Sequence, residues 1–166
     1  MGKKIALWLA GMFGGSIGKL LGVGLIAMIP IIELRGAIPV AYAIGMDWPV
    51  TLIVAIFCNM LPIPIILLFL DAVFNFMKKH HILIKLVEKM EQKARKNKDK
   101  VMKYAFWGLV IFVAIPLPGT GAWTGALVAS VMKMNRKKAL LSIFLGVVTA
   151  AIIVTIFTYG LIGSII

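Results

Sequence analysis

The sequence predicts an all-α integral membrane protein, because the chain is strongly apolar, poor in charge and divided into long hydrophobic runs by basic segments. Of its 166 residues, 61% are hydrophobic and only 14% are charged, and the mean hydropathy is +1.03. A soluble domain averages nearly half apolar residues and about a quarter charged ones. We therefore expect a single membrane domain over 1–166, with a first half (1–77), a polar segment (78–103) and a second half (104–166).

The formal net charge of +12 belongs mostly to lysines in the short segments between the hydrophobic runs. Such segments are typical of cytoplasmic loops, where Lys and Arg orient the protein and bind anionic lipid headgroups. The charge therefore indicates membrane topology, and we expect no nucleic-acid partner. Cys58 is the single cysteine, so no internal disulfide can form and a packing role is expected.

The first half contains one interrupted stretch and one long helix. Residues 5–17 are too short to span a bilayer and are expected at the interface, or as the start of a tilted helix that ends near Pro30. Leu20–Gly45 forms a first broken stretch. After a polar turn in which Trp48 is an interfacial anchor, Val50–Met77 is expected to span the bilayer as a helix kinked by its prolines. Asn59, within this helix, is expected to hydrogen-bond between helices.

The polar segment carries lysines at helical spacing, with apolar residues opposite them, which predicts an amphipathic helix on the membrane surface. Its predicted headgroup contacts, together with Arg136 of the next basic cluster, are Lys85, Lys89 and Lys93. His80 and His81 are adjacent and lack spaced Cys, Asp or Glu partners, so no metal site is predicted.

The second half contains a broken stretch, Tyr104–Met132, and a last span, Ala139–Ile162. Basic clusters lie on both sides of Tyr104–Met132. A single crossing would place these clusters on opposite faces of the membrane, against the positive-inside bias. We therefore predict that the stretch enters the bilayer and returns on the same side, which leaves the basic loops in the cytoplasm.

A weak internal repeat extends this interpretation to the first half. Gly36, Ala37 and Ala41 match Gly121, Ala122 and Ala126 at an offset of about 85, and a later Ile-Phe pair recurs at nearly the same offset. We expect two inverted repeats, each a re-entrant broken hairpin followed by a spanning helix. Inverted repeats with discontinuous helices that meet near the midplane are typical of transporters.

The two breaks hold the residues that predict a binding site. Proline and glycine interrupt the helical hydrogen bonds, and broken backbone is tolerated at membrane depth only inside protein or along a wet cavity. Glu33 and Arg35 are the clearly intramembrane charges of the first half. One interpretation is a structural ion pair. The other gives Glu33 a proton-carrying role and lets Arg35 bind a phosphate or other oxyanion.

The second break carries no charge, but its turn can expose backbone N–H groups at the start of a half-helix that contains Trp123. Such a helix end attracts anions, although the same residues also suit a simple chain reversal. The predicted substrate-binding residues are Arg35, Gly36, Pro39, Pro116, Pro118, Gly119, Thr120, Gly121 and Trp123. Asp71 is a second candidate for proton coupling, although pairing with Lys78 explains it equally well.

Two motifs resemble the small multi-drug export protein family, and more distantly the DedA (VTT-domain) superfamily. They are Glu33-Leu34-Arg35-Gly36-Ala37-Ile38-Pro39 and the run from Pro116 to Gly125. The resemblance implies a prokaryotic inner membrane protein that moves lipid phosphates, coupled to protons. It maps the acidic position onto Glu33 and the hairpin turns onto Pro39 and onto Pro116 to Gly121. DedA proteins typically place arginines around the second turn, whereas Thr120 stands there in this chain.

We therefore expect a flippase for an anionic lipid such as a polyprenyl phosphate. The alternatives are proton-coupled export of cationic amphiphiles and a non-transporting scaffold that docks partners through its basic helix. No nucleotide-binding loop and no nucleophilic triad can be assembled from these residues, so we expect neither an enzyme nor a cofactor. The expected partners are membrane lipids, the substrate and protons, with a homo-oligomer left open.

Overall fold

The computed structural model describes residues 15–79, 98–117 and 119–162. For 71, 73–79, 98–103 and 161–162 it describes the backbone alone. Every element in these ranges is a helix. In chain order the elements are α2 (Ser16–Met28), α3 (Glu33–Ala43), α4 (Trp48–Met60), α5 (Ile63–Lys79), α7 (Lys98–Ala114), α8 (Ala122–Val131), α9 (Arg136–Thr155) and the π-helical turn η1 (Ile156–Ile162).

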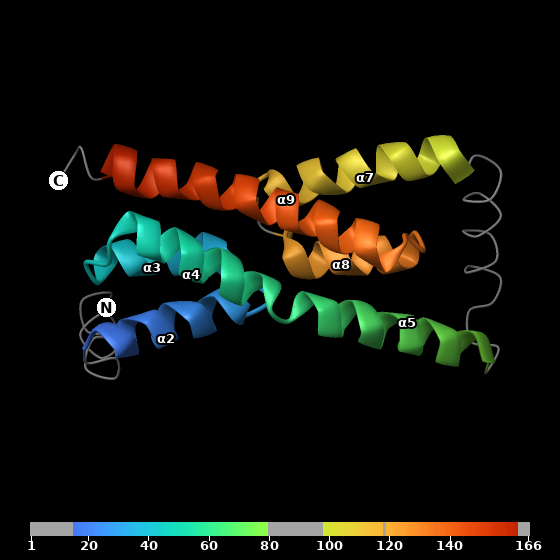
Figure 1. The fold of residues 1–166 in the computed structure, drawn as a ribbon, viewed down its shortest axis with the longest axis horizontal. Coiled ribbons are helices and arrows are strands. Elements are labelled where there is room, and N and C mark those ends of the chain that lie inside the picture. The colour runs from blue at the N-terminus through green and yellow to red at the C-terminus, as the bar shows by residue number, and fades with distance from the viewer. Residues whose placement is uncertain (1–14, 80–97, 118, 163–166) are drawn as a thin grey trace.

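The first broken stretch is a pair of short antiparallel helices, α2 and α3 (Figure 1). The break between them is only 29–32, and α3 begins directly at Glu33. The assignment of this turn to Pro39 was therefore wrong, because Pro39 lies inside α3. A proline can sit within a membrane helix when neighbouring helices and side chains compensate for its missing N–H group.

The long helix of the first half is divided as its prolines predict. α4 begins beside Pro49 with Asp47 at its N-cap, as expected for a helix start. It ends at Met60, and α5 continues in the same direction after a kink at Leu61–Pro62 (Figure 1). Together Trp48–Leu70 form 23 residues with a mean hydropathy of 2.6, long enough to cross a membrane.

The second broken stretch is also two helices. α7 ends at Ala114 and α8 begins at Ala122, so one uninterrupted rod over 104–132 is excluded. α9 and η1 then continue as the last long element, in which Arg136–Gly160 give 25 residues with a mean hydropathy of 2.7. The remaining apolar helices of the described part are shorter than a bilayer crossing requires.

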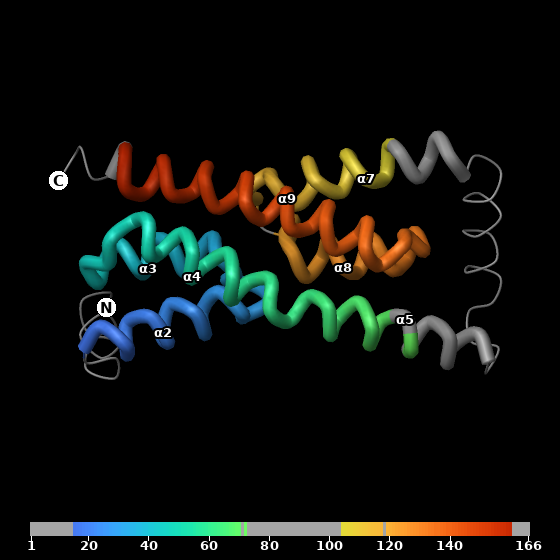
Figure 2. Tube along the Cα trace, viewed as in Figure 1, coloured from blue at the N-terminus to red at the C-terminus, as the bar shows by residue number. Residues whose placement is uncertain are grey.

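The two short helix pairs enter from opposite ends, and their breaks meet in the middle of the molecule (Figure 2). The long elements α4–α5 and α9–η1 run beside them in opposite directions. Many buried positions at the contacts are small, which lets helix backbones approach closely; they include Ala27, Ala37, Ala41, Ala55, Ala122, Ala126, Ala129, Ala139, Ala150 and Ala151. Cys58 packs against α2 near Gly24, as expected for a packing residue. Large apolar side chains such as Ile17, Ile53 and Phe69 point outward, as in a membrane protein.

A recurrent pattern of burial relates the two halves at an offset of 88 residues, slightly longer than the offset of the sequence matches. Gly45 and Lys133, the residues that precede the two long elements, both have positive φ, at 71° and 52°. The buried residues of the long elements then pair as Thr51 with Ala139, Ala55 with Ile143, Asn59 with Val147, Ile63 with Ala151, and Leu67 with Thr155. The two long elements therefore bury residues at matching intervals along their length.

Candidate functional site

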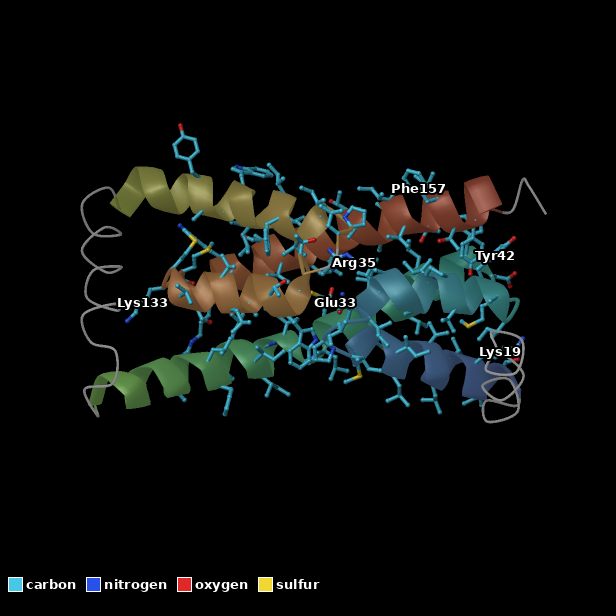
Figure 3. The ribbon with its side chains drawn as sticks, turned by 180° about the vertical axis from the view of Figure 1, so that it is seen from behind. Lys19, Glu33, Arg35, Tyr42, Lys133 and Phe157 are labelled. Carbon is cyan, nitrogen blue, oxygen red and sulfur yellow. The ribbon has the colours of Figure 1, made fainter. Side chains whose placement is uncertain are left out.

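Glu33 and Arg35 lie in the first turn of α3, where the two breaks meet (Figure 3). The Glu33 backbone is left-handed, with φ of 51°, which is uncommon for a residue with a side chain. The Glu33 N–H still donates to the Ile29 carbonyl at 2.9 Å. Such backbone outliers gather at binding and switching sites, because the surrounding structure must hold them in place.

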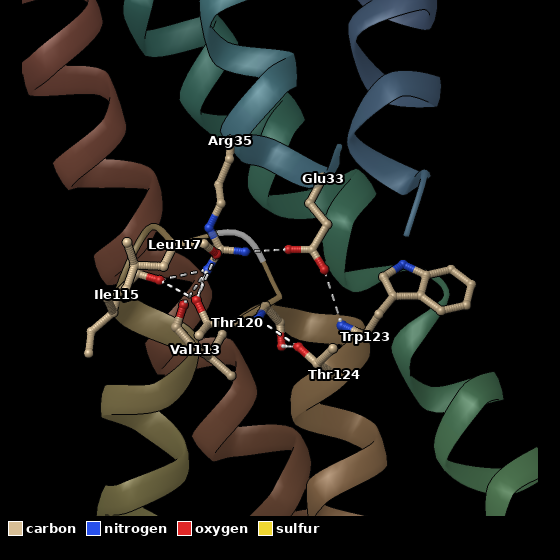
Figure 4. A network of polar contacts seen from close by, with 9 residues as sticks. Glu33, Arg35, Val113, Ile115, Leu117, Thr120, Trp123 and Thr124 are labelled. Carbon is tan, nitrogen blue, oxygen red and sulfur yellow. Dashed lines mark hydrogen bonds and ion pairs between the residues drawn. The ribbon is translucent and has the colours of Figure 1, made fainter. Parts of the chain in front are cut away.

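The Arg35 guanidinium binds the end of α7. Its Nη2 donates to the carbonyl oxygens of Val113 at 3.0 Å and Ile115 at 2.9 Å, and approaches the Thr120 Oγ1 at 3.4 Å (Figure 4). The last carbonyls of a helix lack intrahelical donors and carry the negative end of the helix dipole. Arg35 therefore supplies a positive charge and donors where α7 requires them.

The Glu33 carboxylate binds the start of α8. Its Oε1 accepts from the Trp123 backbone N–H at 3.3 Å, and its Oε2 accepts from Arg35 Nη1 at 2.8 Å (Figure 4). Gly121, the N-cap of α8, makes this approach possible, because a Cβ there would collide with both Glu33 carboxylate oxygens. The carboxylate occupies the position where a helix N-terminus attracts an anion.

The turn between α7 and α8 is held by its own polar groups. The Thr120 hydroxyl lies 2.7 Å from the Ile115 carbonyl and 2.9 Å from the Leu117 carbonyl, to which it can donate. Gly119 has φ of +85°, a conformation that side chains other than glycine rarely adopt. The Gly121 N–H donates to the Thr124 hydroxyl at 2.8 Å and thereby completes the start of α8.

The ion pair is thus largely buried, and each of its charges contacts the end of a helix. The side chains of Arg35 and Glu33 are 17% and 5% exposed, respectively. Arg35 faces the negative end of α7 and Glu33 faces the positive end of α8. Each charge is therefore compensated both by the other charge and by a helix end. Two buried donors of this site, Arg35 Nε and Trp123 Nε1, nevertheless have no hydrogen-bond partner among the described residues. The site can therefore offer further donors to an incoming group.

The structure brings together Glu33, Arg35, Thr120, Gly121 and Trp123 from the predicted set. Gly36 instead lies against Ile32, and Pro39 and Pro116 are exposed and make none of these polar contacts. Pro118 lies outside the described residues, and the side chain of Asp71, on α5, is also not described. Arg136 is exposed at the start of α9, away from the site. The predicted surface helix with Lys85, Lys89 and Lys93, and also His80 and His81, fall outside the described residues.

In the described part, sequence reasoning missed one feature and predicted another incorrectly. The carbonyls of Val113 and Ile115 bind Arg35, but any residue type presents a carbonyl, so no sequence signal could have marked them. Asn59 was expected to hydrogen-bond between helices, and this was wrong. Its side chain is completely buried, and neither its amide oxygen nor its amide nitrogen has a hydrogen-bond partner among the residues that the structure describes.

Comparison with known protein families identifies the chain. The family described as putative small multi-drug export protein matches residues 33–153, from the start of α3 to near the end of α9, and this range includes Glu33, Arg35 and the second break. The chain belongs to this family. No curated protein and no solved structure matches it. The family assignment and the apolar helices together make this a membrane protein of an export family.

Proposed function

We propose that this family member is a proton-coupled transporter that moves an anionic lipid, such as a polyprenyl phosphate, across the prokaryotic inner membrane. In this proposal α2–α3 and α7–α8 are re-entrant hairpins of two inverted repeats, and the basic ends of α5, α7 and α9 face the cytoplasm. The hairpin tips then lie near the midplane, where transporters of this design bind their substrates.

One observation carries the proposal: the Glu33 carboxylate already occupies an anion position, between Arg35 Nη1 at 2.8 Å and the Trp123 N–H at 3.3 Å. A phosphate headgroup uses the same partners, namely a guanidinium fork and the free N–H groups of a helix start. The carboxylate and the headgroup cannot both occupy this position, so binding of one requires release of the other.

Protonation supplies that release. Neutral Glu33 no longer attracts Arg35 or the start of α8 electrostatically, and both become available to the headgroup. When the substrate leaves, deprotonation restores the ion pair and closes the empty site. Each cycle would therefore move a proton together with a phosphate group. The buried ion pair alone is weak evidence for a purely stabilising role, because desolvation offsets most of its attraction.

The test is flux in proteoliposomes that hold a polyprenyl phosphate in one leaflet, with a lipophilic cation offered in parallel. Arg35→Ala should abolish movement of the lipid phosphate, and Glu33→Gln should abolish its dependence on a proton gradient. Lys19→Met is the matched control, because Lys19 is a cation bound to the Ile44 carbonyl at 2.7 Å, far from the site. Full lipid flux in both site variants would overturn the assignment.

A second candidate is proton-coupled export of cationic amphiphiles, which the family description favours. Glu33 would then be the counter-charge for the drug, and Arg35 would only hold Glu33 in place. The same assay separates the two functions, since Arg35→Ala would spare cation efflux and Glu33→Gln would remove it. The basic segment that a scaffold function requires falls outside the described residues, so no observation favours that third possibility.

A further inference from the structure

A second set of buried polar side chains belongs to the two long elements, apart from the ion pair. Thr51 and Asn59 on α4 are both 0% exposed, and Thr155 at the end of α9 is 7% exposed. The Asn59 amide and the Thr155 hydroxyl have no hydrogen-bond partner in the described part. Burying such groups without a partner costs about 1–3 kcal/mol each in proteins, so something other than a side chain is expected to bind them.

These residues form a line along one interface. At its outer end the Tyr159 hydroxyl donates to the Met46 carbonyl at 2.8 Å and lies 2.9 Å from the Thr51 hydroxyl. α4 and α9 run in opposite directions and pack together (Figure 1). Thr155 is one turn inward from Tyr159, and Asn59 is two turns inward from Thr51 on the same face. The line therefore runs from the molecular end toward the centre.

The inner end of this line reaches the level of Glu33. α3 and α4 pack against each other and are joined by the short turn at 44–47, so they run antiparallel (Figure 1). Counted in residues from the middle of that turn, Glu33 on α3 and Cys58 on α4 are equally distant. Asn59, the next residue, is thus at the same depth as the central carboxylate.

Three of the four corresponding positions are apolar. At the offset of 88 residues, Thr51 corresponds to Ala139, Asn59 to Val147 and Thr155 to Leu67, which are buried, whereas Tyr159 corresponds to Asp71. Toward that end of the molecule the buried hydroxyls are those of Ser142, which donates to the Lys138 carbonyl at 2.8 Å, and of Ser130, which has no hydrogen-bond partner in the described part; neither stands at one of these corresponding positions. The polar line is a property of one end of the molecule, the end where Asp47 and Tyr159 lie, and it is not a requirement of the fold.

We infer that water enters between α4 and α9 and forms a hydrated track along Thr51, Asn59, Thr155 and Tyr159, which gives Glu33 access to one face of the membrane only. Buried water typically makes about three hydrogen bonds to groups that lack other partners, and the unpartnered amide and hydroxyl of this line supply such groups. The carbonyl oxygens of Cys58 and Met60 are further acceptors next to Asn59. In the regular helical pattern they would accept from residues 62 and 64, but Pro62 and Pro64 have no N–H group. The role of the track in delivering protons rests on the proposed function, whereas its hydration does not.

Single-cysteine labelling tests the hydration. Cys58 is the only cysteine, so Cys58→Ala gives a background without thiols. Asn59→Cys and Thr155→Cys are then exposed to a small charged methanethiosulfonate reagent in proteoliposomes. Their matched controls are Val147→Cys and Leu67→Cys, the buried counterparts in the other half. A thiol reacts as the thiolate, which forms readily only where water reaches it.

We expect the two track cysteines to react at least about tenfold faster than the two controls, and only when the reagent is added on the Asp47 side. Equal rates at all four positions, or no reaction at Asn59→Cys and Thr155→Cys, would overturn the track. If Asn59→Cys does not fold, Thr155→Cys and Leu67→Cys still form a matched pair. Labelling needs no substrate, so a failed lipid-flux assay with positive labelling would count against the proposed function alone.

Discussion

The two helix breaks have opposite chemistry. The first, at 29–32, is short and is followed at once by both charges, Glu33 and Arg35. The second, between Ala114 and Ala122, is longer and uncharged, and it supplies carbonyls, N–H groups and the Thr120 hydroxyl. Each break also binds the other, because Arg35 donates to carbonyls of the second break and Glu33 accepts from the N–H group of Trp123.

This difference shows how two unlike segments complete each other. Arg35 binds the negative end of α7, and Glu33 binds the positive end of α8, so one ion pair caps two helices that it does not belong to. A simple stabilising pair would need only the contact between its own charges. Removing charge from the first break should therefore have larger effects than changing a hydroxyl in the second, as the following predictions specify.

Arg35→Ala should give the largest effect. It leaves the Glu33 carboxylate without its cation and the Val113 and Ile115 carbonyls without their donor. Loss of one partner of a buried pair costs about 3–5 kcal/mol of unfolding free energy. Unfolding in detergent would measure this loss, and the double variant Glu33→Ala, Arg35→Ala is the control. A double variant that is as unstable as Arg35→Ala would contradict the importance of the unpaired charge.

Glu33→Gln should have the next largest effect. The amide oxygen can still accept from the Trp123 N–H, but the charge that faces Arg35 and the start of α8 is lost. Hydrogen bonds to charged groups contribute about 1.5–3 kcal/mol, so we expect a loss within that range. Asp47→Asn, at an exposed turn residue, should change stability by less than about 0.5 kcal/mol. Equal losses in the two variants would refute a special role for the carboxylate at 33.

Gly121→Ala tests the second break. The new methyl group would collide with the Glu33 carboxylate and the Arg35 Nη1, which must then move apart. Overpacking of this kind costs about 1–3 kcal/mol, and lipid flux should fall with it. Gly108→Ala on α7 is the control, since nothing lies within 4 Å of its added methyl group. Thermal unfolding and lipid flux should be measured on both variants. Equal losses of stability and of flux in Gly121→Ala and Gly108→Ala would contradict this prediction.

Thr120→Val should have the smallest effect. It keeps the shape of the side chain but removes the hydroxyl that contacts the carbonyls of Ile115 and Leu117. We expect a loss of about 0.5–1.5 kcal/mol, because one net hydrogen-bonding group is removed. Thr149→Val removes a hydroxyl bound to the Leu145 carbonyl within α9 and should leave flux unchanged. If Thr120→Val abolished flux without loss of stability, the hydroxyl would instead contact the substrate.

Much of the architecture followed from the sequence. The interruption of both stretches, the kink near Pro62 and the start of α4 beside Pro49 were predicted from proline and glycine, whose backbone restrictions act locally. The position of the first break was less accurate. Pro39 lies within α3 because neighbouring helices can compensate for one missing N–H, and a local rule does not include that compensation.

Residue type alone shows which side chains must be kept from lipid: Glu33 and Arg35 are charges in apolar runs, and their solvation cost depends on their chemistry. Their binding partners depend on the three-dimensional packing, because the carbonyls of α7 and the N–H groups of α8 are backbone atoms about 80 to 90 residues away along the chain. The packing also leaves the Asn59 amide without a hydrogen-bond partner in the described part of the chain, since a residue type shows that an amide is present but not whether the packing provides a hydrogen bond for it.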